Sequence, residues 1–123
     1  MSEKKCFLVV DDDEIFLFTA TYVLKRSFPD VEIITCRNGE EAINKLDGLI
    51  PDAVFVDLNM PIMNGWELLE QINIKHPNPS FAVMIVTSSI DPLDKQKAAA
   101  HELKPRFVEK PLSESKVAEL NLA

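Results

Sequence analysis

Strand-like and helix-like segments alternate along the whole chain. Short strand segments, most of them apolar runs such as FLVV and FAVMIV, are predicted at residues 5–10, 31–35, 53–56, 81–86 and 106–109. Segments with helical character follow them at residues 14–28, 38–46, 64–76, from 91 onwards, and 113–120. Continuous apolar runs of this length are typical of strands that are covered on both faces. The pattern therefore predicts strict alternation of strands and helices.

Polar residues mark where several of these helices begin. Asn38 precedes a glycine and two glutamates, which suits a helix N-terminus. Asp91 is followed by Pro92, a cap residue with proline in the first helical position. Asp13 is expected to cap the helix that follows it. Turns are predicted at residues 60–61 and 64–65, where Met-Pro and Asn-Gly occur.

The alternation predicts an α/β fold in which a parallel sheet carries helices on both faces. Because crossovers between parallel strands are right-handed, the expected arrangement is a doubly wound (βα)5 domain with strand order 2-1-3-4-5. A chain of 123 residues can bury one core, and no repeat or linker divides it. We therefore expect a single domain over residues 1–123.

Composition and charge narrow the possible partners. The chain is 46% hydrophobic and 27% charged, which is ordinary for a folded protein. With 13 basic and 20 acidic residues its formal net charge is −7, which disfavours nucleic acid and anionic membrane as partners. No apolar stretch approaches the ~20 residues of a membrane span. Residues 1–5 contain no signal-peptide cleavage site, so we expect a cytoplasmic protein whose Cys6 and Cys36 are free, small buried thiols.

Polar side chains follow four of the five predicted strands. Asp11, Asp12 and Asp13 follow the first strand. The third, fourth and fifth strands are followed by Asp57, by Thr87-Ser88-Ser89, and by Lys110-Pro111. Sites in such sheets form at the carboxyl ends of the strands, near the point where strand order reverses. Acids at strand ends often only cap a helix, and Lys-Pro often only marks a loop, but their coincidence at four strand ends predicts a site.

The charges at this edge predict a metal ion. The first and third strands are neighbours in the expected order, so their ends lie about 5 Å apart. Carboxylates from Asp11, Asp12 and Asp57 would then crowd one pocket, and Lys110 alone cannot balance them. A hard divalent cation with oxygen ligands completes the site most simply, and Mg²⁺ suits a few carboxylates together with waters and a phosphate.

From about residue 5 to residue 111 the chain resembles the response-regulator receiver domains, the CheY-like family with its flavodoxin-like fold. The motifs are the acidic pair after the first strand, VDLNMPIMNG around the third, a hydroxyl after the fourth and Lys-Pro after the fifth. The resemblance implies that Asp57 is the phosphoacceptor and that Thr87 and Lys110 hold phosphoryl oxygens. It also implies a set of Mg²⁺ ligands: Asp12, Asp57, the backbone carbonyl of Asn59 and, through water, Asp11.

The function implied is that of a single-domain response regulator in a two-component or phosphorelay system. Asp57 would accept a phosphoryl group from a histidine kinase or a histidine phosphotransfer protein. The protein would then switch its protein contacts or relay the phosphate, without being an enzyme beyond its own phosphorylation and dephosphorylation. In the family, residues at the positions of Asn59 and Ser89 influence hydrolysis. Thr87 and an inward-turning Phe107 would form the switch, unless Phe107 is permanently buried.

The helix predicted at residues 14–28 carries more apolar residues than one buried face needs. One stripe at helical spacing contains Phe16, Ala20, Val23 and Leu24. A second stripe contains Ile15, Phe18 and Tyr22, close to the acidic edge. An exposed second stripe would suit docking of the histidine-bearing helices of a kinase. The alternative is a rotated helix that buries part of this stripe in the core.

Three features depart from the family pattern. Leu103-Lys104, followed by Pro105, stands where a Gly-Ala pair often precedes the fifth strand. Only 12 residues follow Pro111, so the last helix is short, and dimers built on the fourth helix, fifth strand and fifth helix are in doubt. No output domain is expected in this chain.

Three other functions were compared with the receiver. A haloacid-dehalogenase-like phosphatase needs an acid two residues after its nucleophilic aspartate, where this chain has Asn59. A flavin-binding flavodoxin needs a hydroxyl- and glycine-rich phosphate loop after the first strand, where this chain has acids. A degenerate receiver that binds partners without phosphate is disfavoured because every chemical position is filled. Terminal effector and phosphate shuttle both stay open.

Overall fold

The computed structural model of the protein describes residues 4–122. Residues 1–3, part of the segment used for the signal-peptide prediction, lie outside the described range. Strands and helices alternate along the described chain, as predicted. In order, the elements are β1 (Cys6–Val10), α1 (Glu14–Ser27), β2 (Glu32–Cys36), α2 (Gly39–Leu46), β3 (Ala53–Val56), α3 (Gly65–Lys75), β4 (Ala82–Thr87), α4 (Pro92–Ala100), β5 (Arg106–Glu109) and α5 (Glu114–Glu119).

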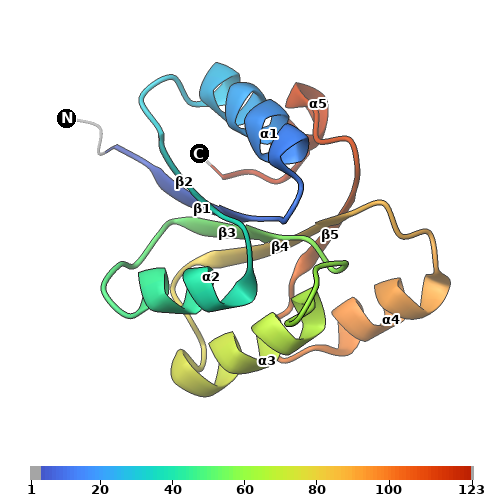
Figure 1. The fold of residues 1–123 in the computed structure, drawn as a ribbon. Coiled ribbons are helices and arrows are strands. Elements are labelled where there is room, and N and C mark those ends of the chain that lie inside the picture. Colours follow the sequence, from blue (N-terminus) through green and yellow to red (C-terminus); the bar gives the residue numbers. More distant parts are fainter. Residues whose placement is uncertain (1–3, 123) are drawn as a thin grey trace.

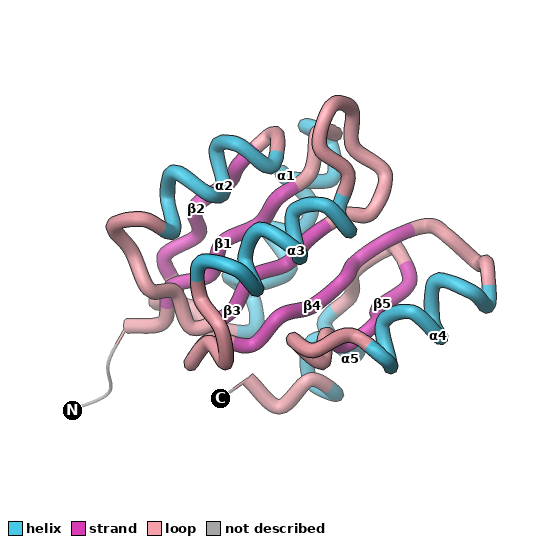
Figure 2. The backbone as a smooth tube through the Cα atoms, turned by 90° about the horizontal axis from the view of Figure 1, so that it is seen from below, coloured by secondary structure: helices cyan, strands magenta, loops and turns pink. Residues whose placement is uncertain are grey.

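The strands form one five-stranded parallel sheet in the order β2-β1-β3-β4-β5, which confirms the predicted doubly wound fold. Figure 1 shows α1 and α5 on one face of the sheet and α2, α3 and α4 on the other. In Figure 2 the same molecule is seen from the side that α2, α3 and α4 cover. The chain leaves β1 toward one edge and returns to β3 on the other side of β1, so the order reverses at this pair of strands.

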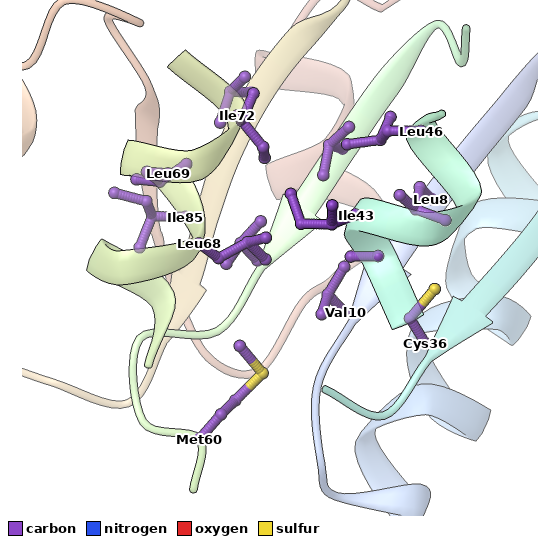
Figure 3. Close-up of a cluster of buried hydrophobic side chains, with 14 of the residues drawn as sticks. Leu8, Val10, Cys36, Ile43, Leu46, Met60, Leu68, Leu69, Ile72 and Ile85 are labelled. Atoms are coloured by element: carbon purple, nitrogen blue, oxygen red, sulfur yellow. The ribbon is translucent and has the colours of Figure 1, made fainter. Parts of the chain in front are cut away.

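Each strand sends alternate side chains into two separate hydrophobic clusters. In β1, Leu8 and Val10 join the cluster beneath α2 and α3, which Figure 3 shows in close-up. Phe7 and Val9 instead join the cluster shared with α1 and α5. All four side chains are buried, as expected for a strand between two helical layers.

Side-chain caps decide where the helices begin. Asp13 caps α1 as predicted, because its Oδ1 accepts a hydrogen bond from the Ile15 N–H at 3.0 Å. Asn38 and Asn64 cap α2 and α3 in the same way. The predicted helices at residues 38–46 and 64–76 therefore begin one residue too early, since a cap residue has extended rather than helical backbone.

The loop before β5 has Leu103 and Lys104 in place of the Gly-Ala pair that is common in the family, and it makes a left-handed turn at Lys104. Lys104 has a φ of 51°, a region that L-residues other than glycine rarely enter. The Lys104 N–H donates to the carbonyl of His101 at 3.0 Å, and Leu103 packs against the cluster beneath α2 and α3. Pro105 is buried at the start of the strand. The loop thus accommodates larger side chains without losing its tight turn.

Two further expectations concern the thiols and the membrane. Cys6 and Cys36 are free, and Cys36 is fully buried whereas Cys6 is half-buried. Among residues 4–122, no helix has both the length and the apolar composition required to cross a membrane.

Candidate functional site

The register of β1 against β3 places two acids side by side. Val10 pairs with Val56, so Asp11 and Asp57 leave the sheet at the same level. The Asp57 N–H donates to the carbonyl of Val10 at 3.1 Å. The Asp11 N–H donates to the carbonyl of Cys36, on the other neighbouring strand, at 3.0 Å. The backbone of both acids is therefore held by the last hydrogen bonds of the sheet.

Three carboxylates converge at this edge. One carboxylate oxygen from each of Asp11, Asp12 and Asp57 lies within 4.8 Å of the others. Asp11 is 0% exposed and Asp57 is 5% exposed, whereas Asp12 lies on the surface. The structure therefore brings together the acids that the sequence placed on neighbouring strand ends.

Lys110 enters the same cluster from the end of β5. Its Nζ lies 2.8 Å from Asp11 Oδ2 and 3.8 Å from Asp57 Oδ1. Its backbone N–H donates to the carbonyl of Thr87 at 2.8 Å, which anchors it to the end of β4. The side chain is only 19% exposed, so its charge is directed at the acids with limited screening by water. One ammonium thus faces three carboxylates.

Burial controls the protonation of the two inner acids. Loss of solvation and, after it, the nearby Asp11 carboxylate raise the pKa of Asp57 to about 6, while Lys110 opposes the shift. Burial also raises the pKa of Asp11, against the hydrogen bond that Lys110 donates to it. Both carboxylates are thus poorly neutralised by the protein alone, and a further cation would favour their ionised forms.

The donor set fits a hard divalent cation such as Mg²⁺. All three side chains offer carboxylate oxygens, the ligand type that Mg²⁺ prefers. Both oxygens of Asp11 are already engaged, Oδ1 by the Asp13 N–H at 2.9 Å and Oδ2 by Lys110. Asp12 and Asp57 are therefore the acids best suited to direct ligation, and Asp11 is better suited to contact through water.

The loop from β3 to α3 holds Asp57 through its backbone. The Gly65 N–H donates to the carbonyl of Leu58 at 3.0 Å and folds the start of α3 onto the end of β3. A Cβ at Gly65 would lie 2.4 Å from the Asp57 carbonyl oxygen, so only glycine allows this approach. Met60 is buried in the cluster of Figure 3, whereas Ile62 is exposed with a φ of 67°. Asn59 is exposed beside Asp57.

Thr87 lies buried at the end of β4, and its hydroxyl oxygen accepts a hydrogen bond from the Ser89 N–H at 3.2 Å. The oxygen is the acceptor in this bond, so the hydroxyl proton remains available to another group. Ser89 donates its own hydroxyl to Asp94 Oδ2 at 2.6 Å, and Trp66 Nε1 donates to Asp94 Oδ1 at 3.4 Å. Asp94 and Trp66, which sequence reasoning missed, therefore link the β4–α4 loop to α3.

Phe107 is half-buried and packs against the cluster beneath α2 and α3. Lys95 Nζ lies 5.9 Å from the centroid of its ring. Part of Phe107 is therefore exposed to solvent in this structure. The alternative, in which Phe107 is permanently buried, does not hold here.

The two stripes of α1 have different environments. Phe16, Ala20 and Leu24 are buried, Val23 is half-buried, and Leu17, which the sequence reasoning left out, is buried as well. The second stripe is exposed throughout: Ile15, Phe18 and Tyr22. The alternative in which a rotated helix buries part of that stripe is therefore wrong.

Comparison with known sequences identifies the family. Residues 7–120 match the response regulator receiver domain. Among curated proteins, the chain is 36% identical over 105 residues to a protein-glutamate methylesterase/protein-glutamine glutaminase of Geobacillus kaustophilus. That alignment covers 85% of this chain but 30% of the relative. A second relative with the same name, from Nitrosospira multiformis, is 38% identical over 71% of this chain and 24% of its own length.

Solved structures give the same result over nearly the whole chain. A two component response regulator from Cytophaga hutchinsonii superposes with a TM-score of 0.88 at 32% identity, covering 97% of this chain and 95% of that one. The chemotaxis protein CheY4 of Vibrio cholerae superposes with a TM-score of 0.81 at 21% identity, covering 96% of each chain, which supports the fold alone. Together with the match over residues 7–120, these likenesses show that the chain belongs to the response regulator receiver domain family.

Proposed function

We propose that this receiver domain accepts a phosphoryl group on Asp57 from a phosphohistidine, in a reaction that requires Mg²⁺. The observation that carries the proposal is the convergence of three carboxylates within 4.8 Å, with the Lys110 ammonium 3.8 Å from Asp57. Aspartyl-phosphate formation needs a positioned carboxylate and neutralising charge, with little proton chemistry. The site supplies both from rigid strand ends.

In the proposed reaction, a carboxylate oxygen of Asp57 attacks phosphorus. The new O–P bond forms as the P–N bond to the donor imidazole breaks, and the ring, protonated on its other nitrogen, leaves as neutral imidazole with the electron pair of that bond. Lys110 would neutralise negative charge on the equatorial oxygens, and the Thr87 hydroxyl would donate a hydrogen bond to one of them. Mg²⁺, held by Asp12, Asp57 and the Asn59 carbonyl, would supply further charge neutralisation when bound.

When no cation is bound, burial raises the pKa of Asp57 to about 6. Only the ionised carboxylate is a nucleophile, so the proportion of reactive Asp57 falls as the pH drops through that value. A bound cation would extend the reactive range to lower pH, because it favours the ionised form.

The exposed stripe of α1 supports a docking surface for the phosphodonor. Ile15, Phe18 and Tyr22 form an apolar patch on the helix that begins beside the acidic cluster. A histidine kinase or histidine phosphotransfer protein would place its histidine-bearing helices against this patch. Replacing Phe18 and Tyr22 with alanine should slow phosphotransfer from the cognate donor but leave phosphorylation by a small phosphodonor unchanged. Unchanged transfer from the cognate donor would exclude the docking role.

Release of signal would involve the elements around Thr87 and Phe107. A phosphoryl group that accepts a hydrogen bond from the Thr87 hydroxyl would draw the end of β4 toward Asp57, and the half-buried Phe107 would then turn inward. Three statements stay predictions: the receiver is a single-domain regulator, it is cytoplasmic, and it has no enzymatic output. Its role as effector or as phosphate shuttle also stays open. The chain spans about 30% of its first curated relative, so we do not extend that protein's named activity to this chain.

The proposal is tested by incubating the protein with a small phosphodonor and Mg²⁺ and then measuring its intact mass. We expect one added phosphoryl group that base removes, no addition without Mg²⁺, and none in Asp57→Asn. The exposed Asp30→Asn is the matched control and should be phosphorylated like the wild type. Phosphorylation of Asp57→Asn at the wild-type rate would contradict the assignment.

A further inference from the structure

The Lys110 ammonium lies over the face of an aromatic ring from α1. Its Nζ is 4.3 Å from the centroid of the Phe16 ring. This distance is well inside the ~6 Å at which a cation is attracted by the negative face of a ring. Phe16 is 8% exposed, and partial burial of both groups strengthens the attraction. The ring is thus a third contact for Lys110, in addition to the carboxylates of Asp11 and Asp57.

The sheet explains why these groups meet. Val108 belongs to the cluster shared with α1 and α5, and Lys110, two residues later, follows β5 with its ammonium against Phe16 of α1. Asp57 stands in the same relation to Phe55, a member of the same cluster. Phe16 lies in the first turn of α1, directly beside this edge, and belongs to that cluster too. The ring therefore borders the space between Lys110 and the hydrophobic core.

We propose that Phe16 is a positioning residue for Lys110. Lysine has a long flexible stem, and a single carboxylate holds its ammonium only as a point charge. The ammonium is hydrogen-bonded to Asp11 at 2.8 Å and lies 3.8 Å from Asp57 while it contacts the ring. The ring face adds a third attraction that restricts the ammonium to this position, where a phosphoryl group on Asp57 would meet it. This role rests on the function proposed for Asp57.

The substitution Phe16→Leu tests the proposal because leucine fills the space without offering a ring face. With a small phosphodonor and saturating Mg²⁺, we expect the maximal rate of phosphorylation to fall about three- to tenfold. Phe16→Tyr, which keeps the ring face, should restore most of the rate. Phe28→Leu is the control, because that ring packs edge-on against Phe7 at 5.3 Å, beyond the other end of the same helix. It should leave the rate unchanged.

A double-mutant cycle separates positioning from general packing. In a Lys110→Ala background the ring has no ammonium to hold, so Phe16→Leu should cause no further loss of rate. A fall of the same size in both backgrounds would show that Phe16 acts only through the core and would overturn the proposal. An unchanged rate in Phe16→Leu alone would overturn it as well.

A spectroscopic readout keeps this test independent of phosphorylation. The ε-methylene protons of Lys110 lie near the ring face, so their NMR signals should be shifted upfield in the wild type and return toward ordinary positions in Phe16→Leu. Unshifted signals in the wild type would overturn the contact even if Asp57 is phosphorylated. If the wild type accepts no phosphoryl group, the proposed function and the positioning role fail together, while the NMR shift still reports whether the contact exists.

Discussion

Replacing Asp57 with asparagine should stabilise the metal-free protein at neutral pH. Burial and the neighbouring Asp11 raise the pKa of Asp57 from 3.8 to about 6. The folded state therefore binds this proton more tightly than the unfolded state does, and ionising Asp57 destabilises the fold. The destabilisation is complete above about pH 6, decreases as the pH falls toward 4, and is absent below the unfolded-state pKa.

The expected size follows from the difference between the two pKa values. A difference of roughly two pKa units means that ionised Asp57 destabilises the fold by at most about 3 kcal/mol at pH 7.5. This difference already includes the opposing attraction to Lys110, so replacing the ionised carboxylate with asparagine should give a gain of about 1–3 kcal/mol. Urea unfolding in the presence of a chelator measures it, at pH 7.5 and again at pH 4.

Two controls make the result specific. The exposed Asp30→Asn should leave the free energy of unfolding within about 0.5 kcal/mol of the wild type. Saturating Mg²⁺ should reduce the advantage of Asp57→Asn, because an ion that binds the folded acids stabilises the wild type. An Asp57→Asn protein that is no more stable at pH 7.5, or that keeps its full advantage at pH 4, would refute the reasoning.

Three further substitutions test the backbone and the hydrogen bonds around the site. Gly65→Ala forces a Cβ to within 2.4 Å of backbone in the loop after β3 and should lower the free energy of unfolding in urea by about 1–3 kcal/mol. The control Gly48→Ala, with open space around it, should not destabilise the fold. Ile62→Asn should raise stability by about 1 kcal/mol, because the exposed isoleucine has a φ of 67° that asparagine tolerates better; no gain would show that this backbone is unstrained. Ser89→Ala removes the 2.6 Å hydrogen bond to the Asp94 carboxylate on α4 and should lower the free energy of unfolding by about 1 kcal/mol. An equal loss in Ser88→Ala, at an exposed position, would contradict that explanation.

The strands and helices were predictable because, in this fold, the burial of each element determines the pattern of apolar residues in its sequence. Strands covered on both faces read as apolar runs, and β3 and β5 lie at the predicted residues. The predicted strands at 31–35 and 81–86 are each displaced by one residue. Val31 is buried, but its N–H closes a turn onto the carbonyl of Phe28, so burial there does not mean pairing in the sheet.

Only the site residues that directly follow the ends of the strands were predictable from the sequence. Asp11, Asp12 and Asp57 converge because parallel strands deliver their next residues to one edge. The Phe16–Lys110 contact left no such signal, because Phe16 fits the core stripe of α1 without reference to Lys110. Hydrogen bonds made by single side chains, such as those of Asp94, likewise depend on rotamers that no periodicity in the sequence records.

The most direct test of the account is to locate the modified residue. After treatment with a small phosphodonor and Mg²⁺, reduction with borohydride converts an aspartyl phosphate to homoserine, which peptide mass mapping can place in the sequence. We predict that homoserine replaces Asp57 alone. Modification at Asp11 or Asp12 instead, or no modification at all, would contradict the claim that the strand ends present Asp57 to the phosphoryl group.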